Sequence, residues 1–259
     1  MRPDHEVVVI GAGFAGIGAS IRLTDAGIDD HVLLEEGDDV GGTWYWNQYP
    51  GVAVDIPSFS YQFSFERRTD WSRVYASGKE LYAYARECAE KYRVRERIRF
   101  GVRVEAAAFD DDAAVWRLQT GGGNEVTARF VIGATGVFSQ PKPPDIPGLE
   151  RFGGVTVHTA RWDPELDLAG KRVAIIGTGA SAVQVIPAIA PVVEHLTVFQ
   201  RTPIWCLPKP DRPLSPLVRR ILRWSRARHH AITVQTVGMP AAPQIIGHRR
   251  GSFRRPGLR

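Results

Sequence analysis

The N-terminal part of the chain alternates apolar runs with an amphipathic stretch. The run Val7–Ile10 is wholly apolar and ends at a glycine, a pattern typical of a buried parallel strand. A helix is predicted over Phe14–Ala26, with Gly27 as its C-terminal stop. A second strand is predicted over His31–Leu34. The opening of the chain therefore has the form of a strand–helix–strand unit.

A longer helix is predicted in the middle of the chain. Ser77 and Glu80 have the spacing of a capping box, and the helix is expected to run to about Tyr92. Four apolar residues recur at helical spacing and form one face, which places Cys88 in the core rather than at a reactive site: Leu81, Tyr84, Ala85 and Cys88.

Short alternating segments follow this helix. They predict strands over 103–109, 115–120 and 126–131, with a turn at Gly121–Asn124 between the last two. We interpret them as a small antiparallel insert, after which the chain returns to a main sheet through Phe130–Gly136.

A second strand–helix–strand pattern begins near residue 171. A buried strand is predicted over Lys171–Ile176, and the next strand over Leu196–Phe199. The helix between them is expected to be broken by Pro187 and Pro191. Between the two halves, Val137–Pro147 is rich in proline and is predicted to be a linker.

The C-terminal part has a different composition. From Ile204 onward, eleven arginines and one lysine stand against one acidic residue, so this part carries +11 and the rest −6 of the formal net charge of +5. A basic helix is predicted over Leu217–Ala231, and no periodicity is present from Thr233. Such a tail raises the alternative of a nucleic-acid-binding protein, but it lacks interleaved aromatic residues.

The bulk composition narrows the class further. A chain of 259 residues can hold one large or two modest domains, and its apolar and charged fractions are ordinary for a globular protein. Two cysteines make no disulfide framework and favour a reducing compartment, which predicts a cytoplasmic protein. No apolar run reaches the length of a membrane span, and neither a signal peptide nor a membrane partner is expected.

Two glycine motifs carry the chemistry. Gly11, Gly13 and Gly16 follow the first strand, and Glu35 lies 24 residues after Gly11, where an acid can accept hydrogen bonds from a ribose. A second motif runs from Gly177 to Ala182, with alanine at its third position. After the strand that follows, Arg201 stands where a guanidinium can bind the 2′-phosphate of NADP. The sequence therefore predicts two dinucleotide sites.

Between these motifs the chain has the pattern F-x-G-x-x-x-H-x-x-x-W-D over Phe152–Asp163. Together, the three ordered motifs resemble those of the type I Baeyer–Villiger monooxygenases. These flavoenzymes use FAD, NADPH and O2 to insert an oxygen atom beside a ketone carbonyl. The resemblance runs from about Val7 to about Pro210, and it implies that His158 acts in coupling between domains or structurally, with direct proton transfer as the alternative.

The same resemblance assigns roles to further residues. The segment from Gly41 to Gly51 resembles the family's flavin segment, which implies that Trp44 lies beside the flavin and that Asp55 lies near the isoalloxazine and the nicotinamide. Asp55 and His158 are thus the predicted catalytic residues. The predicted cofactor-binding residues, beyond those already named, are Gly42, Thr43, Tyr61, Val104, Gly177, Thr178, Gly179, Ala180, Ser181, Ala182, Gln184 and Thr202.

The expectation is an α/β chain with the Rossmann-like fold of a two-dinucleotide-binding flavoprotein, incomplete at its C-terminus. The predicted organisation is an FAD domain at 1–140, a linker at 141–170, the opening of an NADP domain at 171–232 and an irregular basic tail at 233–259. The predicted function is Baeyer–Villiger oxidation of a ketone to an ester or lactone, without turnover in a truncated chain. The alternatives are a monooxygenase that oxidises nitrogen or sulfur and a non-catalytic FAD-binding fragment. Oligomeric state and the particular ketone stay open.

Overall fold

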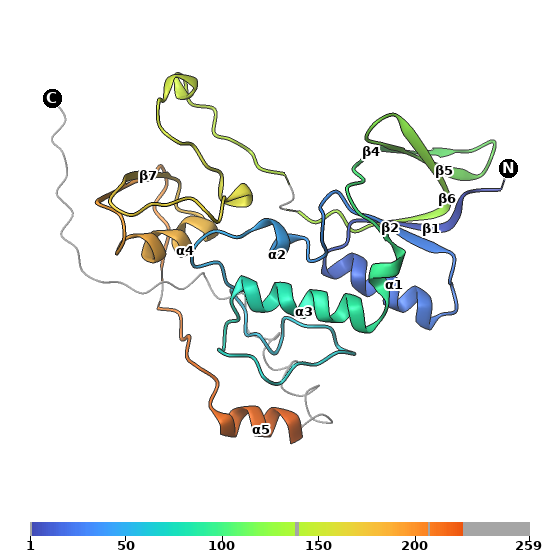
Figure 1. The fold of residues 1–259 in the computed structure, drawn as a ribbon, viewed down its shortest axis with the longest axis horizontal. Coiled ribbons are helices and arrows are strands. Elements are labelled where there is room, and N and C mark those ends of the chain that lie inside the picture. Colours follow the sequence, from blue (N-terminus) through green and yellow to red (C-terminus); the bar gives the residue numbers. More distant parts are fainter. Residues whose placement is uncertain (1, 138–139, 207, 225–259) are drawn as a thin grey trace. The chain divides into compact units, whose positions relative to one another are not determined.

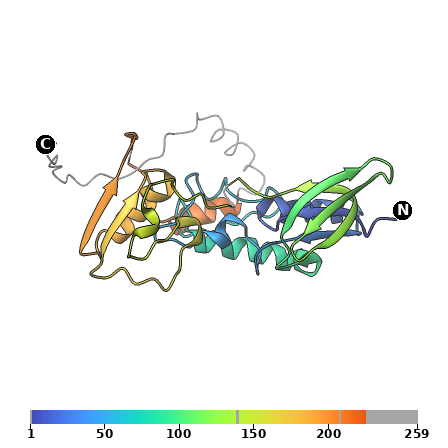
Figure 2. The same ribbon diagram turned by 90° about the horizontal axis from the view of Figure 1, so that it is seen from above.

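The computed structural model describes residues 2–137, 140–206 and 208–224. They form two compact units (Figures 1 and 2). Of the described residues, the first unit holds 2–52, 63–66, 77–137 and 140–167, and the second holds 53–62, 67–76, 168–206 and 208–224. The domain boundaries predicted from the sequence stay a prediction. The sequence did not indicate that residues 53–62 and 67–76 pack with the second unit.

A six-stranded sheet forms the centre of the first unit, in the order β3-β2-β1-β6-β5-β4. Strands β1 (His5–Ile10), β2 (His31–Leu34), β3 (Ile98–Arg99) and β6 (Asn124–Gly133) are parallel neighbours. Strands β4 (Val104–Asp110) and β5 (Val115–Thr120) are antiparallel to their neighbours. The α/β class is confirmed, whereas the two-residue strand β3 was too short to give a sequence pattern.

Strand β6 joins the parallel and antiparallel parts. Its first half pairs with β5, its second half pairs with β1, and Ala128 is opposite both Trp116 and His5. The last strand predicted for the antiparallel insert and the predicted return strand therefore belong to one continuous strand, β6, in a single sheet. Alternation over this stretch showed that it is extended, but not which strand lies on each side.

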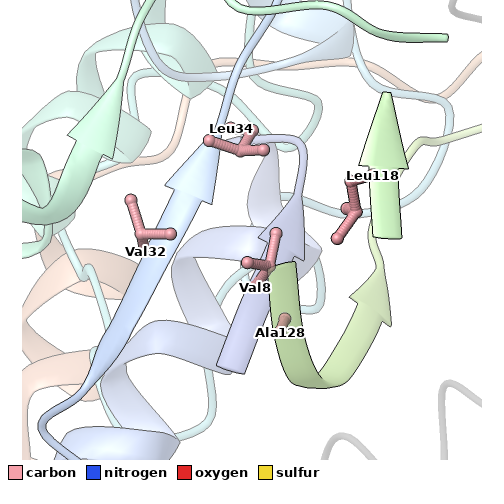
Figure 3. Packing of buried hydrophobic residues seen from close by; sticks show 5 residues of the cluster. All are labelled: Val8, Val32, Leu34, Leu118 and Ala128. Carbon is pink, nitrogen blue, oxygen red and sulfur yellow. The ribbon is translucent and has the colours of Figure 1, made fainter. Parts of the chain in front are cut away.

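Buried residues from both parts of this sheet share one core. Figure 3 shows Val8, Val32 and Leu34 of the parallel strands beside Leu118 and Ala128 of the antiparallel ribbon. These residues come from alternate positions of each strand and so lie on the same face. This shared apolar cluster holds the ends of β1 and β2 in place, where the first glycine motif begins.

Two helices of the first unit pack together, α1 (Phe14–Asp25) and α3 (Gly78–Lys91) (Figure 1). Helix α1 also packs on β1 and β2. Gly27 has φ +77°, and its N–H donates to the carbonyl of Thr24, which confirms the predicted helix stop. The hydroxyl of Ser77 accepts from the backbone N–H of Glu80, which confirms the cap of α3.

The apolar face predicted for α3 is buried as expected, including Cys88, which is 1% exposed. Burial raises the pKa of the Cys88 thiol to about 11. Cys206 is exposed, and neither cysteine is in a disulfide.

We therefore expect the two thiols to react at very different rates with a thiol reagent at pH 8. One equivalent should react quickly in the folded chain, because only Cys206 is accessible, and two should react in denaturant. The absorbance of the chromophore that the reagent releases measures how many thiols react in the folded chain and in denaturant. A Cys206→Ser variant should show no fast equivalent while it is folded, and a fast equivalent in that variant would contradict the placement of Cys88.

The second unit contains two parallel strands, β7 (Arg172–Ile176) and β8 (His195–Phe199), with α4 (Ala180–Ile189) between them in the chain. Figure 2 shows the two strands side by side. The prediction of a buried strand is wrong for β7, because none of its five residues is buried and Ile176 at its end is 53% exposed. Among the residues that the structure describes, β7 and β8 pair only with one another, so both edges remain uncovered.

Helix α4 contains Pro187 and continues to Ile189, so the predicted break at Pro187 is wrong. A proline removes one N–H and crowds the preceding turn, and α4 ends two residues after Pro187 rather than at it. Of the predicted basic helix, the structure describes α5 (Pro216–Trp224), and residues 225–231 lie outside the described part, as does the predicted tail at 233–259. Within the described part, no helix is long and apolar enough to cross a bilayer.

Candidate functional site: two dinucleotide turns

The first glycine turn connects β1 to α1. Gly11 has φ +101°, which a side chain rarely tolerates, and its N–H donates to the carbonyl of Leu34 at the end of β2 (2.8 Å). Gly13 is the N-cap of α1 with φ −74° and ψ −170°, and it offers no side chain to the first amides of the helix. The N-terminus of α1 thus presents backbone N–H groups and the positive end of the helix dipole to an anion.

The third glycine of this turn is required by packing. A Cβ atom at Gly16 would lie 1.9 Å from the carbonyl oxygen of Gly11. A Cβ atom at Gly11 would lie 2.6 Å from the carbonyl oxygen of Ala134, which follows β6. The turn is therefore closed on both sides by backbone, and only glycine fits at these two positions.

Glu35 follows β2 directly and is 5% exposed. Its carboxylate accepts from the backbone N–H of Ala12 (2.6 Å) and from that of Gly37 (2.8 Å). These contacts hold the acid beside the first glycine turn. A carboxylate has further lone pairs, so it can also accept hydrogen bonds from ribose hydroxyls, as the sequence predicts.

A second glycine loop lies against the first. The N–H of Gly41 donates to the carbonyl of Ala12 (3.0 Å), and a Cβ atom at Gly42 would lie 2.9 Å from the Cα atom of Gly13. Both residues have positive φ. We call the group Gly11, Ala12, Gly13, Glu35, Gly41 and Gly42 the glycine cradle.

Asp39 anchors the loop that carries Gly41 and Gly42, and sequence reasoning missed it. Its carboxylate accepts from the hydroxyl of Tyr82 on α3, from the guanidinium of Arg95 and from the N–H of Val40. Burial tends to raise the pKa of Asp39, but these hydrogen bonds outweigh it and hold that pKa below its ordinary value. No local pattern marks such a contact, because Tyr82 and Arg95 are far from Asp39 in the chain.

The predicted flavin segment continues into the short helix α2 (Thr43–Trp46), in which Trp44 is buried and Thr43 exposed. The guanidinium of Arg161 lies over the Trp46 ring, 4.1 Å from its centroid, a cation–π contact. Arg161 belongs to the linker motif, so this motif and the flavin segment are in contact within one unit.

His158 has a structural contact in the same motif. Its Nδ1 atom accepts from the N–H of Ala160 (3.1 Å) and caps the short helix η3 (Thr159–Arg161). Val104 is the first residue of β4, and its half-buried side chain packs against the core cluster of the sheet. The predicted roles of His158 and Val104 toward a cofactor stay predictions.

The second glycine turn repeats the geometry of the first. Gly177 has φ +106°, and its N–H donates to the carbonyl of Phe199 at the end of β8 (2.9 Å). Gly179 caps α4 with φ −70° and ψ −176°, close to the values of Gly13. A Cβ atom at Gly177 or at Gly179 would meet nothing within 4 Å, so space is open in front of this turn.

The remaining residues of the second turn lie where the sequence predicted. Ala182 is buried in the third position of the turn, and Thr178, Ala180 and Ser181 lead into α4. Arg201 and Thr202 follow β8 after one intervening residue, Gln200, and are exposed. Arg201 thus stands at the carboxyl end of a parallel strand, next to the turn that begins at the neighbouring strand.

Asp55, Tyr61 and Gln184 all belong to the second unit. Asp55 is exposed and Tyr61 half-buried. The side-chain amide of Gln184 donates to the carbonyl of Ala53 (3.1 Å) and accepts from the N–H of Ala53 (3.2 Å). Gln184 was predicted from the family resemblance to bind a cofactor, and that role stays a prediction.

The donor set indicates the ligand class. Among the described residues, no group of three or more His, Cys, Asp or Glu side chains has the arrangement of a metal site. Each turn instead combines glycine backbone N–H groups, a helix N-terminus and a polar residue at the end of the next strand. This combination is the one that binds the pyrophosphate and ribose of a dinucleotide.

Residues 8–239 match the family described as pyridine nucleotide-disulphide oxidoreductase. The chain belongs to this family. A Baeyer-Villiger monooxygenase of Streptomyces coelicolor is 48% identical over 217 residues, which are 84% of this chain and 42% of the relative. A Baeyer-Villiger monooxygenase of Pseudomonas aeruginosa is 42% identical over 249 residues, 93% of this chain and 47% of the relative.

Solved structures agree with these relatives. A crystal structure of OTEMO in complex with FAD and NADP matches with a TM-score of 0.83 and 39% identity, over 90% of this chain and 45% of that chain. The resemblance to Baeyer–Villiger monooxygenases is confirmed as a similarity in both sequence and fold. The chain spans less than half the length of each of these proteins.

Proposed function

We propose that the chain binds FAD at the glycine cradle and NADPH at the second glycine turn, and that it serves in Baeyer–Villiger oxidation of a ketone with O2. The observation that carries the proposal is the pair of glycine turns with matched backbone angles and matched hydrogen bonds. The relatives support it, since those at 48% and 42% identity are Baeyer-Villiger monooxygenases and the similar OTEMO structure holds FAD and NADP.

The residues of the cradle fit an FAD molecule. Gly13 and Gly42 face each other without side chains, so a pyrophosphate can approach the backbone N–H groups at the start of α1. Glu35 would accept hydrogen bonds from the ribose of the adenosine part, and Trp44 would lie beside the flavin ring. Bound FAD would supply the redox chemistry with O2, and the protein would orient it and exclude water.

The second turn fits NADPH in the same manner. Gly177 and Gly179 leave open space at the start of α4, and Arg201 would bind the 2′-phosphate through a charge-assisted, bidentate contact. Asp55, in the same unit, would act near the nicotinamide, and His158 would couple the linker motif to the flavin segment.

The test of FAD binding is a Gly13→Ala variant. The added Cβ would lie 3.4 Å from the Cα atom of Gly42, an ordinary contact, so the fold should persist while the space for the pyrophosphate narrows. We expect the parent chain to bind FAD and the variant to bind it at least about 10-fold more weakly, the equivalent of about 1.4 kcal/mol. Flavin fluorescence titration measures this, and circular dichroism checks the fold. Equal affinities, or no FAD binding by the parent, would refute the proposal.

For the second site, an Arg201→Ala variant should bind NADPH about 10- to 150-fold more weakly, because a charge-assisted hydrogen bond contributes about 1.5–3 kcal/mol. NADH lacks the 2′-phosphate, so its affinity should not change. Isothermal titration with both nucleotides measures the difference. Arg172→Ala is the matched control, since Arg172 lies at the opposite end of β7 and its loss should affect neither nucleotide. Equal losses for NADPH and NADH would contradict the assignment.

The finer features of the proposal concern substrate and location. A ketone is proposed because a relative from Acinetobacter, 38% identical, is a cyclohexanone 1,2-monooxygenase. A fusion of this chain with the part of the Streptomyces coelicolor relative that it does not span, incubated with FAD, NADPH and matched ketone and sulfide substrates, would distinguish Baeyer–Villiger oxidation from sulfur oxidation by the products formed. A cytoplasmic location is proposed because both cysteines are free thiols.

A further inference from the structure

The segment Ala53–Asp55 packs with the second unit although the chain reaches it directly from the predicted flavin segment. Its backbone is held on several sides. The N–H of Val54 donates to the carbonyl of Ala76 (3.0 Å), which ties the segment to the extended stretch 72–76. Two side chains from distant parts of the sequence, Gln184 and Lys209, bind Ala53 and Val54 of this segment.

Gln184 binds Ala53 through both ends of its amide. The Nε2 atom donates to the carbonyl of Ala53 (3.1 Å), and the N–H of Ala53 donates to Oε1 (3.2 Å). This pair of bonds imitates one rung of a β-ladder between residues 131 positions apart. Because Gln184 lies on α4, directly after the second glycine turn, the contact joins Ala53 to the helix that starts at that turn.

Lys209 binds the next residue. Its Nζ atom donates to the carbonyl of Val54 (2.9 Å) and lies 4.4 Å from the centroid of the Tyr75 ring. The side chain is half-buried, and this burial lowers the pKa of Lys209, against the opposing effects of Asp211 and Asp55. The ammonium group is thus bonded to a backbone carbonyl and lies over an aromatic face.

The stretch that carries Lys209 is itself fixed. The N–H of Val74 donates to the carbonyl of Arg212, and the N–H of Leu214 donates to the carbonyl of Ser72, both at 3.0 Å. Arg73 and Asp211 form an ion pair at 2.7 Å. Residues 72–76 therefore lie between Ala53–Ser58 on one side and residues 209–214 on the other, and Lys209 reaches across to the first of these segments.

We infer that Gln184 and Lys209 are positioning residues that fix the backbone around Asp55 to the body carrying the second glycine turn. The inference deepens the proposed function, on which the role of Asp55 at the nicotinamide rests. If Asp55 belongs to the NADPH-binding unit, its position relative to that nucleotide is set before the nucleotide binds. The conformational entropy lost in ordering this segment then does not reduce the affinity for the nucleotide.

The experiment follows amide hydrogen exchange of the 259-residue chain by NMR, without any cofactor. A Gln184→Ala variant should raise the exchange rate of the Ala53 amide at least 10-fold, because its acceptor is lost. Gln200→Ala is the matched control, since Gln200 lies in the same unit and its side chain donates to the hydroxyl of Thr178 instead. Lys209→Met should also raise the exchange rate of the Val54 amide. Its acceptor, the carbonyl of Ala76, stays in place, but the segment loses the anchor at the Val54 carbonyl. Exchange rates equal to those of the parent would overturn the inference.

A Gln184→Glu variant separates this specific contact from simple packing. A protonated carboxyl has one donor and one acceptor, like the amide, whereas an ionised one only accepts and would face the carbonyl of Ala53. The protection of the Ala53 amide, corrected for intrinsic exchange, should therefore rise as pH falls from 7 to 4. The introduced carboxyl should titrate above the usual value of about 4.3. Protection that does not change with pH would contradict the positioning role.

A titration with NADP+ completes the test. If Gln184 only positions Ala53, Gln184→Ala should change the affinity for NADP+ less than 3-fold while the Ala53 amide exchanges faster. A large loss of affinity with normal exchange would instead make Gln184 a cofactor ligand and overturn the inference. If the parent chain binds no NADP+, the proposed function fails. The exchange data still show whether Gln184 and Lys209 hold Ala53 and Val54 in place.

Discussion

A Gly16→Ala variant is expected to lose at least about 3 kcal/mol of unfolding free energy, the upper end of the range for added atoms in a packed site. The reason is geometric. The new Cβ would lie 1.9 Å from the carbonyl oxygen of Gly11, and this oxygen belongs to a backbone closed on its other side by Ala134. Helix α1 would have to move away from β1, and burial between them would be lost.

Urea unfolding monitored by circular dichroism measures the change. Gly18→Ala is the matched control, because Gly18 lies on the same helix and its added Cβ would contact no backbone, only the ring of Phe63, at 3.3 Å. That variant should stay within about 1 kcal/mol of the parent, since alanine also favours the helix. A Gly16→Ala chain with the midpoint of the parent would show that the turn is not packed as described.

The second large effect is expected for Glu35→Ala. Two buried N–H groups, those of Ala12 and Gly37, would lose their acceptor, and each unsatisfied group costs about 1–3 kcal/mol. We expect a loss of about 3 kcal/mol in unfolding free energy. FAD affinity should fall at least about 10-fold, the equivalent of about 1.4 kcal/mol. Both losses have one cause, because the carboxylate that shapes the turn is also the proposed partner of the ribose.

Glu36→Ala controls for the removal of a negative charge, since Glu36 is exposed and pairs with Arg103 at 3.3 Å. It should change stability by less than about 1 kcal/mol, as expected for a surface ion pair. Denaturant unfolding and flavin titration on the same samples give both quantities. A Glu35→Ala chain that is as stable as the parent would contradict the buried hydrogen bonds of this carboxylate.

Most elements of the first unit could be predicted from the sequence. The strand His31–Leu34 has the predicted bounds, α1 starts at the predicted residue, and α3 starts after its predicted cap. These features depend on interactions a few residues apart, such as the bond from the Glu80 amide to the Ser77 hydroxyl. Both glycine turns were also predictable, because their requirements on φ and on close packing are local to about six residues.

Sequence pattern was a poorer guide to strand order and exposure. Strand β6 reads as two segments, and only the structure makes it one strand between β1 and β5. The apolar sequence of β7 predicted a buried strand. Its exposure depends instead on how many strands and helices pack against it. Hydrophobicity describes what a segment can bury, whereas the partners that bury it come from elsewhere in the chain.

The sequence by itself determined the two dinucleotide turns, the acid at Glu35 and the arginine at position 201, because these depend on residue type at fixed short spacing. Only the tertiary structure decided where Asp55 belongs. The bonds from Gln184 and Lys209 to Ala53 and Val54 join residues 131 and 155 positions apart. Contacts of that range exist only after the second unit has folded, so no local pattern could have assigned Asp55 to it.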